Sequence, residues 1–271
     1  MERKTQHFVH SLAKGFKVLQ AFRKDRPTLT LTEIASLTGM NTPTAQRMTD
    51  TLLSLGYLKR NKRKDFFLGA KVLTLGFAYL HGSQLTQLAT QYLDAFFERR
   101  HWTVNMSVLE GDEVIYLARR EQQRFLKYDV QPGFRLPFNC TAMGKVLAAG
   151  LPDEELEALL REGNLVRMTR HTVVDPEQLA EEVRQTRRRG YAFCQRELSL
   201  DVSAVAAPIL DENGQVVAAV NVALPADQAE GELLAEVTGQ VVDLGRELSI
   251  SLGYQGEYPL IRQAGSTEKS A

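Results

Sequence analysis

The chain has 271 residues, 44% of them hydrophobic, which is enough for two domains of ordinary size, each with its own core. The formal net charge of zero conceals an asymmetry, because residues 1–80 carry 14 Lys and Arg against 5 Asp and Glu, and residues 81–271 carry 19 against 28. The charge asymmetry favours a nucleic-acid partner for the basic part only. The lack of a long apolar run favours a cytoplasmic protein without membrane contact.

The first expected element is a helix over residues 11–22, and Pro27 marks its end. Its apolar side chains recur at helical spacing and would form the inner face: Leu12, Phe16, Leu19 and Phe22. We expect this helix to complete a three-helix core with the two helices that follow.

A short helix over residues 31–37 comes next, with Thr30 as its cap and Glu33 three residues later. Gly39 can adopt the positive φ that a sharp turn between two helices requires. The order of helix, glycine turn and second helix predicts a helix-turn-helix.

The second helix of this motif is expected over residues 44–55, with Thr42 as N-cap and Pro43 at the first helical position. Its buried stripe would consist of Ala45, Met48, Leu52 and Leu55. The side chains left to point elsewhere are hydrogen-bonding groups: Thr44, Gln46, Arg47 and Thr49. In the major groove such groups could read base edges, so we take Thr42, Thr44, Gln46 and Arg47 as candidate DNA contacts.

A basic hairpin follows over residues 57–68, with its turn at residues 61–64. Five cations lie within six positions and could neutralise phosphates: Lys59, Arg60, Lys62, Arg63 and Lys64. Taken alone, the helix-turn-helix could be only a packing motif, and the basic run could be only a solvated face. Together they indicate a winged helix-turn-helix that binds double-stranded DNA.

Two connector helices are expected over residues 70–80 and 85–100. One face of the second would consist of Leu85, Leu88, Tyr92 and Phe96. Alternating strands at residues 103–109 and 113–119 then predict a hairpin that opens a new domain.

The rest of this domain should combine strands and helices. Strands are expected near residues 125–130 and at 204–210 and 216–223, and helices through Ala149 and at residues 153–161, 176–189 and 228–252. This pattern predicts an α+β domain with an antiparallel sheet and flanking helices. Residues 254–271 lack periodicity and are expected to be disordered.

Five ordered blocks of sequence resemble the IclR family of bacterial transcriptional regulators. They are Ser11-Leu-Ala-Lys-Gly15, Leu53-Ser-Leu-Gly-Tyr-Leu58, Leu136-Pro-Phe-Asn-Cys-Thr-Ala-Met-Gly-Lys-Val-Leu147, Arg189-Gly-Tyr191 and Gly214-Gln-Val-Val-Ala-Ala219. The resemblance implies a winged helix-turn-helix domain at residues 8–69, a helical linker that dimerises at 70–101, and a GAF-like effector domain at 102–253. The amino-acid sequences around Cys140 and Arg196 resemble those of the family branch that senses aromatic acids such as protocatechuate and 4-hydroxybenzoate.

The same resemblance implies the effector contacts. They are Thr141 and Ala142 at a helix start, Cys194 and Glu197 after the Arg189-Gly-Tyr191 strand, Ala204 on the next strand, and Asn221 and Ala223 on the last. Ala204, Asn221 and Ala223 stand where other members can have a cysteine and two serines, so a hydroxyl-rich pocket is in doubt. Independently, the free N–H groups of a helix beginning at Thr141 could hold a carboxylate. The alternative is that Thr141 is only a cap, Cys140 a core residue, and Glu197 and Asn221 satisfied core groups.

Two other functions remain open from the residues. An enzyme fused to a DNA-binding module has little support, because the chain lacks the dinucleotide, phosphate-loop, GxSxG and HExxH motifs and its five histidines are scattered. The cysteines, Cys140 and Cys194, have no metal-ligand spacing, so no cofactor and no metal are expected. An architectural DNA-binding protein without a ligand would not need the large acidic domain.

The expected regulator is a homodimer, or a pair of dimers, on a pseudo-palindromic operator. A small-molecule effector would change the disposition of the two DNA-binding modules through the connector helices. Either repression or activation is compatible with this scheme, and activation would add RNA polymerase as a partner.

Overall fold

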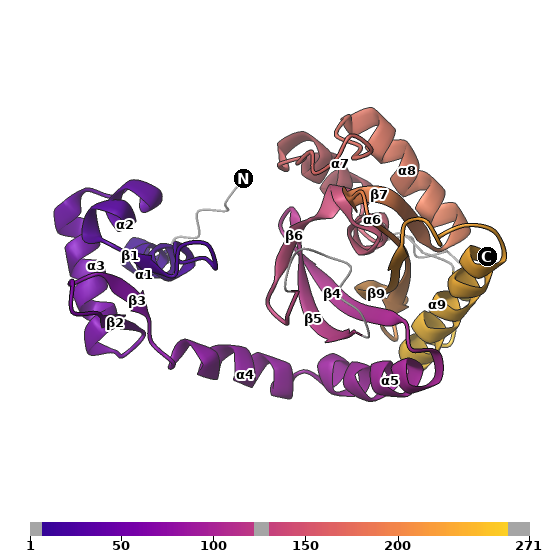
Figure 1. Ribbon diagram of the computed structural model, residues 1–271, viewed down its shortest axis with the longest axis horizontal. Helices are drawn as coiled ribbons and strands as arrows, with labels where there is room; N and C mark the ends of the chain where they lie inside the picture. The colour runs from indigo at the N-terminus through magenta and orange to yellow at the C-terminus, as the bar shows by residue number, and fades with distance from the viewer. Residues whose placement is uncertain (1–6, 122–129, 260–271) are drawn as a thin grey trace. The chain divides into compact units, whose positions relative to one another are not determined.

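The computed structural model describes residues 7–121 and 130–259. Contacts divide the chain into two compact units, Met1–Gly82 and Ser83–Ala271. The expected linker is therefore shared, because helix α4 (Val72–Gly82) belongs to the first unit and α5 (Gln84–Arg100) to the second (Figure 1). No helix in the described part of the chain has the length and apolar character needed to cross a bilayer.

The first helix, α1 (His10–Gln20), buries only part of the expected inner face. Val18 is fully buried and packs with Phe22, whereas Leu12 and Phe16 are 61% and 49% exposed. Of the expected inner face, Phe22 and the partly buried Leu19 pack into the core but Leu12 and Phe16 do not, because the helix has apolar residues on two sides. It ends at Gln20, well before Pro27.

The next two helices form the predicted helix-turn-helix. In α2 (Leu31–Thr38) the Thr30 side chain accepts a hydrogen bond from the Glu33 N–H, and the Glu33 carboxylate accepts one from the Thr30 N–H, which is a complete capping box. Gly39 takes φ 66°, as the turn requires.

Helix α3 (Thr42–Ser54) differs from expectation at both ends. Its N-cap is Asn41, whose Oδ1 accepts from the Thr44 N–H, so Thr42 is the first helical residue and not the cap. Thr49 is buried, because its hydroxyl donates to the Gln46 carbonyl and so needs no solvent. Leu55 follows the last turn and is 51% exposed, so it does not belong to the buried stripe.

The wing is a three-stranded sheet with the order β1-β3-β2, formed by β1 (Thr28–Leu29), β2 (Leu58–Arg60) and β3 (Phe66–Leu68). Strand β1 was not expected. The turn of the hairpin is held by Asn61, whose Oδ1 accepts from the N–H groups of Arg63 and Asp65.

The second unit is built on a six-stranded antiparallel sheet with the order β6-β5-β4-β9-β8-β7. The strands are β4 (Thr103–Glu110), β5 (Glu113–Arg120), β6 (Arg135–Pro137), β7 (Ala192–Ser199), β8 (Val202–Leu210) and β9 (Val216–Pro225). The sheet with helices on both faces confirms the expected α+β class. Part of the strand expected near residues 125–130 lies outside the described residues.

Helices cover both faces of this sheet (Figure 1). Helix α6 (Ala142–Ala149) lies on one face with α8 (Pro176–Arg189), against which α7 (Asp153–Glu162) packs. Helices α5 and α9 (Gly231–Ser251) lie on the other. The buried face of α5 consists of Thr86, Ala89, Leu93 and Phe96. Of the expected set, Phe96 is buried, and Leu85 and Tyr92 pack against the same core while partly exposed.

The first residues after α9 are ordered, contrary to expectation for the tail. Tyr254 is 6% exposed and its hydroxyl donates to the Glu257 carbonyl, while the Tyr258 hydroxyl donates to the Pro208 carbonyl on β8. Two aromatic side chains thus anchor this segment, and the remainder of the expected tail lies outside the described residues.

Candidate functional site

A cavity lies between the sheet and the start of α6. All seven residues expected to contact an effector line it, namely Thr141, Ala142, Cys194, Glu197, Ala204, Asn221 and Ala223. Strand register explains part of this, since Cys194, Ala204 and Ala223 lie side by side across β7, β8 and β9. The cavity volume is about 30 Å³, so it has room for water but not for a ring.

The wall formed by α6 depends on a close approach to the backbone before it. Thr141 is the N-cap and its Oγ1 accepts from the Gly144 N–H at 3.0 Å. A Cβ on Gly144 would lie 2.1 Å from the Phe138 carbonyl oxygen, so only glycine allows this packing. The first N–H groups of a helix have no partner within it, which leaves those of Ala142 and Met143 at the helix start for other acceptors.

Glu197 lines the cavity, but its carboxylate forms an ion pair with a buried lysine. Lys145 on α6 is 2% exposed, and its Nζ donates to both carboxylate oxygens of Glu197 at 2.6 and 2.8 Å and to Glu182 at 2.5 Å. Burial alone would lower the pKa of Lys145, but its neighbours Cys194, Glu197 and Glu182 together outweigh burial and raise the pKa, so the lysine stays charged. Glu197 therefore has the partners of a satisfied core group.

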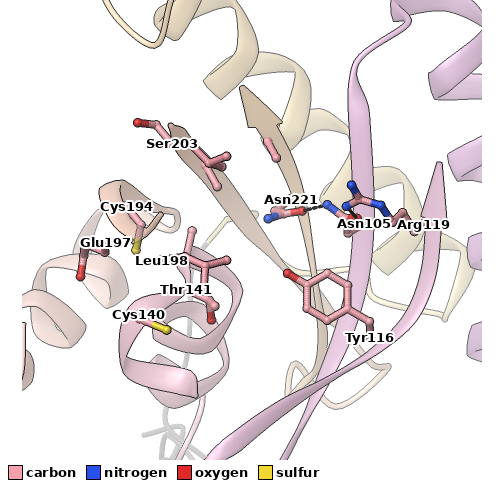
Figure 2. A pocket seen from close by; sticks show the side chains of 14 residues that line it. Asn105, Tyr116, Arg119, Cys140, Thr141, Cys194, Glu197, Leu198, Ser203 and Asn221 are labelled. Carbon is pink, nitrogen blue, oxygen red and sulfur yellow. Dashed lines mark hydrogen bonds between the residues drawn. The ribbon is translucent and has the colours of Figure 1, made fainter. Parts of the chain in front are cut away.

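Four further polar residues line the cavity and were not predicted from the sequence: Asn105, Tyr116, Arg119 and Ser203. Arg119 Nη1 donates to Asn105 Oδ1 at 2.6 Å, and Asn105 Nδ2 donates to Asn221 Oδ1 at 2.7 Å. The Arg119 side chain is 6% exposed, and its Nε donates to Glu121 at 3.1 Å. Figure 2 shows this row of side chains on the sheet, facing α6. A signal existed in the alternation of β4 and β5, which puts Asn105 and Arg119 opposite each other.

Two thiols and a phenol at the cavity are kept neutral by burial. Burial raises the pKa of the Cys140 thiol to about 12, and Glu197 acts in the same direction. Burial also raises the pKa of Cys194 well above its ordinary value, against the opposing charge of Lys145. The pKa of Tyr116 is raised by burial as well, and its ring lies between the sheet and α6 in Figure 2. Neither cysteine is therefore a ready nucleophile.

The candidate DNA-reading side chains lie on α3. Thr42 and Arg47 are exposed, and Thr44 and Gln46 are partly exposed. Asp50, which the sequence reasoning did not consider, binds two of the candidates: Gln46 Nε2 donates to its Oδ1 at 2.6 Å, and Arg60 Nη2 lies 3.6 Å from the same oxygen. Arg60 also stacks on the Phe66 ring at 4.5 Å. The carboxylate thus couples helix and wing.

The other cations of the wing, Lys59, Lys62, Arg63 and Lys64, are all exposed. Lys64 adopts φ 68° in the turn, so three of them project from a tight hairpin tip. This arrangement can place several positive charges along a phosphate backbone.

Comparisons with known proteins match both units. Residues 11–62 match the IclR helix-turn-helix domain, and residues 77–250 match the C-terminal domain of bacterial transcriptional regulator IclR. The chain is 38% identical over 216 residues to the Pca regulon regulatory protein of Pseudomonas putida, covering 79% of this chain and 74% of that one. It is 30% identical over 256 residues to the p-hydroxybenzoate hydroxylase transcriptional activator of Acinetobacter baylyi, covering 93% of each.

Solved structures give the same picture. An IclR homolog from Microbacterium hydrocarbonoxydans, crystallised in complex with 4-hydroxybenzoate, superposes with a TM-score of 0.74 at 26% identity, covering 89% of this chain and 98% of that one.

Proposed function

Because the chain belongs to the IclR family of bacterial transcriptional regulators, it is a DNA-binding regulator and not an enzyme, and we propose that an aromatic acid is its effector. The observation that carries this proposal is the cavity at the start of α6, which brings together all seven candidate contacts. Relatives named for the Pca regulon and for p-hydroxybenzoate hydroxylase, together with a homolog bound to 4-hydroxybenzoate, support the ligand class.

The effector's carboxylate would bind at the N-terminus of α6. The N–H groups of Ala142 and Met143 and the positive end of the helix dipole supply donors there. A cavity that holds a benzene ring measures about 150 Å³, so an aromatic acid must displace side chains here. Binding would therefore change the packing of α6 against the sheet, which offers a physical origin for the response.

DNA would be bound by α3 in the major groove and by the wing on the flanking phosphates. Arg47 is the exposed candidate for a guanine contact, while Lys62 and its neighbours would neutralise phosphates. Gln46 and Arg60 would exchange their bonds with Asp50 for bonds to DNA.

The acting species would be a homodimer. None of the residues of α4 is buried, and its large apolar side chains Leu73 and Phe77 are 74% and 63% exposed. In the same unit, Leu12 and Phe16 on α1 line an apolar groove. Apolar surface of this extent calls for a partner, and a second copy would also match the two-fold symmetry of an operator. The dimer would act in the cytoplasm, where contact with RNA polymerase would allow activation as well as repression.

A thermal shift screen tests the effector class. Protocatechuate, 4-hydroxybenzoate and benzoate should raise the melting temperature in a concentration-dependent manner, because a ligand of the folded state stabilises it. Small aliphatic acids and uncharged phenols serve as comparisons. A response to the aliphatic acids alone would overturn the aromatic assignment, and no response to any acid would favour an architectural DNA-binding protein.

A further inference from the structure

The row of hydrogen bonds across β5, β4 and β9 has a fixed direction. Arg119, Asn105 and Asn221 face one another because they are register partners on neighbouring strands. An arginine side chain has only donors and remains charged. Asn105 must therefore present its carbonyl oxygen to Arg119, and its amide nitrogen is left to donate to Asn221.

The same constraint passes to Asn221. Its carbonyl oxygen is occupied by Asn105, so its two N–H groups are turned elsewhere. Figure 2 shows the Asn221 nitrogen pointing away from Asn105, on the side of α6. Within the described residues this nitrogen makes no hydrogen bond, and Asn221 is one of the residues that line the cavity. The orientation of both amides thus follows from the chemistry of Arg119, which can only donate.

We propose that Arg119, acting through Asn105, fixes the Asn221 amide so that the cavity offers it only as a hydrogen-bond donor. The site then selects ligand groups that accept hydrogen bonds without donating any, and a carboxylate above all. Asn221 is the binding residue, and Arg119 and Asn105 are positioning residues. As a statement about an aromatic acid, this inference rests on the proposed function.

The Asn105→Asp variant reverses the direction of the hydrogen bond between residues 105 and 221 with a side chain of nearly the same shape. A carboxylate at this position still accepts from Arg119, but it can only accept from Asn221 as well. Asn221 must then turn its nitrogen toward residue 105 and its oxygen toward the cavity. The variant retains both hydrogen bonds of the row, so we expect it to fold.

Binding of two probes, 4-hydroxybenzoate and its neutral near-isostere 4-hydroxyacetophenone, tests the reversal by calorimetry. The wild type should bind the acid more tightly than the ketone. Asn105→Asp should weaken both by about tenfold or more, since each loses a donor and meets an acceptor. Asn164→Asp adds the same charge at an exposed position and should change neither.

The ketone distinguishes orientation from charge. If Asn105→Asp weakens only the acid and leaves the ketone unchanged, the effect is simple repulsion and the proposed orientation is wrong. If both probes bind Asn105→Asp as they bind the wild type, the row does not set the polarity of the site.

A double-mutant cycle at residues 105 and 221, read out as melting temperature, tests the orientation of these hydrogen bonds without a ligand. Asn221→Asp alone still accepts from Asn105, and Asn105→Asp alone accepts from Asn221, so each should fold. Together they place two acceptors face to face with no donor between them, and the loss of melting temperature should exceed the sum of the single losses. Additive losses would overturn the orientation. If the wild type binds neither probe while the losses of melting temperature are still non-additive, the assignment of an aromatic acid as effector is wrong. The orientation of the hydrogen bonds from Arg119 to Asn221 is then still supported.

Discussion

Replacing Lys145 by Met should destabilise the effector-binding unit severely. The substitution removes the only charged partner of the Glu197 carboxylate among the described residues, and Glu197 is 6% exposed. Glu182 is 38% exposed and can regain water, so the loss comes mainly from the stranded Glu197 carboxylate. Breaking a buried ion pair in this way costs about 3–5 kcal/mol.

Urea unfolding measures this loss. The single tryptophan, Trp102, lies in the same unit, so its fluorescence should report on the transition. The variant Lys145→Met with Glu197→Leu replaces the pair by apolar groups and should recover most of the stability. A loss below about 1 kcal/mol for Lys145→Met, or a double variant no more stable than the single one, would refute the reasoning.

The pH dependence has a defined sign. The groups around Lys145 together raise its folded-state pKa above the ordinary value, so its contribution is complete below the unfolded pKa and is lost only as the pH rises through the folded one. The wild type should therefore show no step from this lysine between pH 5 and 8, a range that lies below the ordinary lysine pKa of about 10.4.

The remaining predictions concern DNA, assembly and the thiols. Arg47→Ala should cost about 1–3 kcal/mol and blur base preference in binding to selected DNA, and unchanged preference would place another residue at the base edges. Lys62→Ala should weaken all sequences alike and lower the salt slope by about one unit. Phe16→Glu should shift the sedimentation of the chain toward the monomer, and an unchanged mass would exclude the apolar face of α1 from the interface. Cys140 and Cys194 should resist a thiol reagent at pH 8 in the native protein and react in urea, because burial raises both pKa values.

Local signals in the sequence predicted much of the fold. The capping box at Thr30 and Glu33 and the left-handed Gly39 are formed as expected, because both depend on neighbours within a few residues. Helix α8 begins and ends where Pro176 and Gly190 indicate. The prediction of Thr42 as N-cap was wrong by one residue, because Asn41 caps the helix, and only the backbone distinguishes two residue types that both cap well.

Contacts that depend on tertiary packing could not be predicted in this way. Helix α1 has apolar residues on two sides, and only the position of its neighbours decides that Val18 is buried and Leu12 is not. The candidate cavity residues were brought together as the resemblance implied, but the partner of Glu197 is Lys145, 52 residues away. Asn105 and Asn221 are separated by 116 residues, so their hydrogen bond leaves no periodic signal.

Reciprocal coupling between effector and operator is the most direct test of the central claim. DNA selected from a random library by the full-length chain supplies the operator, and 4-hydroxybenzoate is the effector probe. We predict that the acid changes the Kd for this DNA, and that the DNA changes the Kd for the acid by the same factor. Two Kd values that are each unchanged by the other ligand would contradict it.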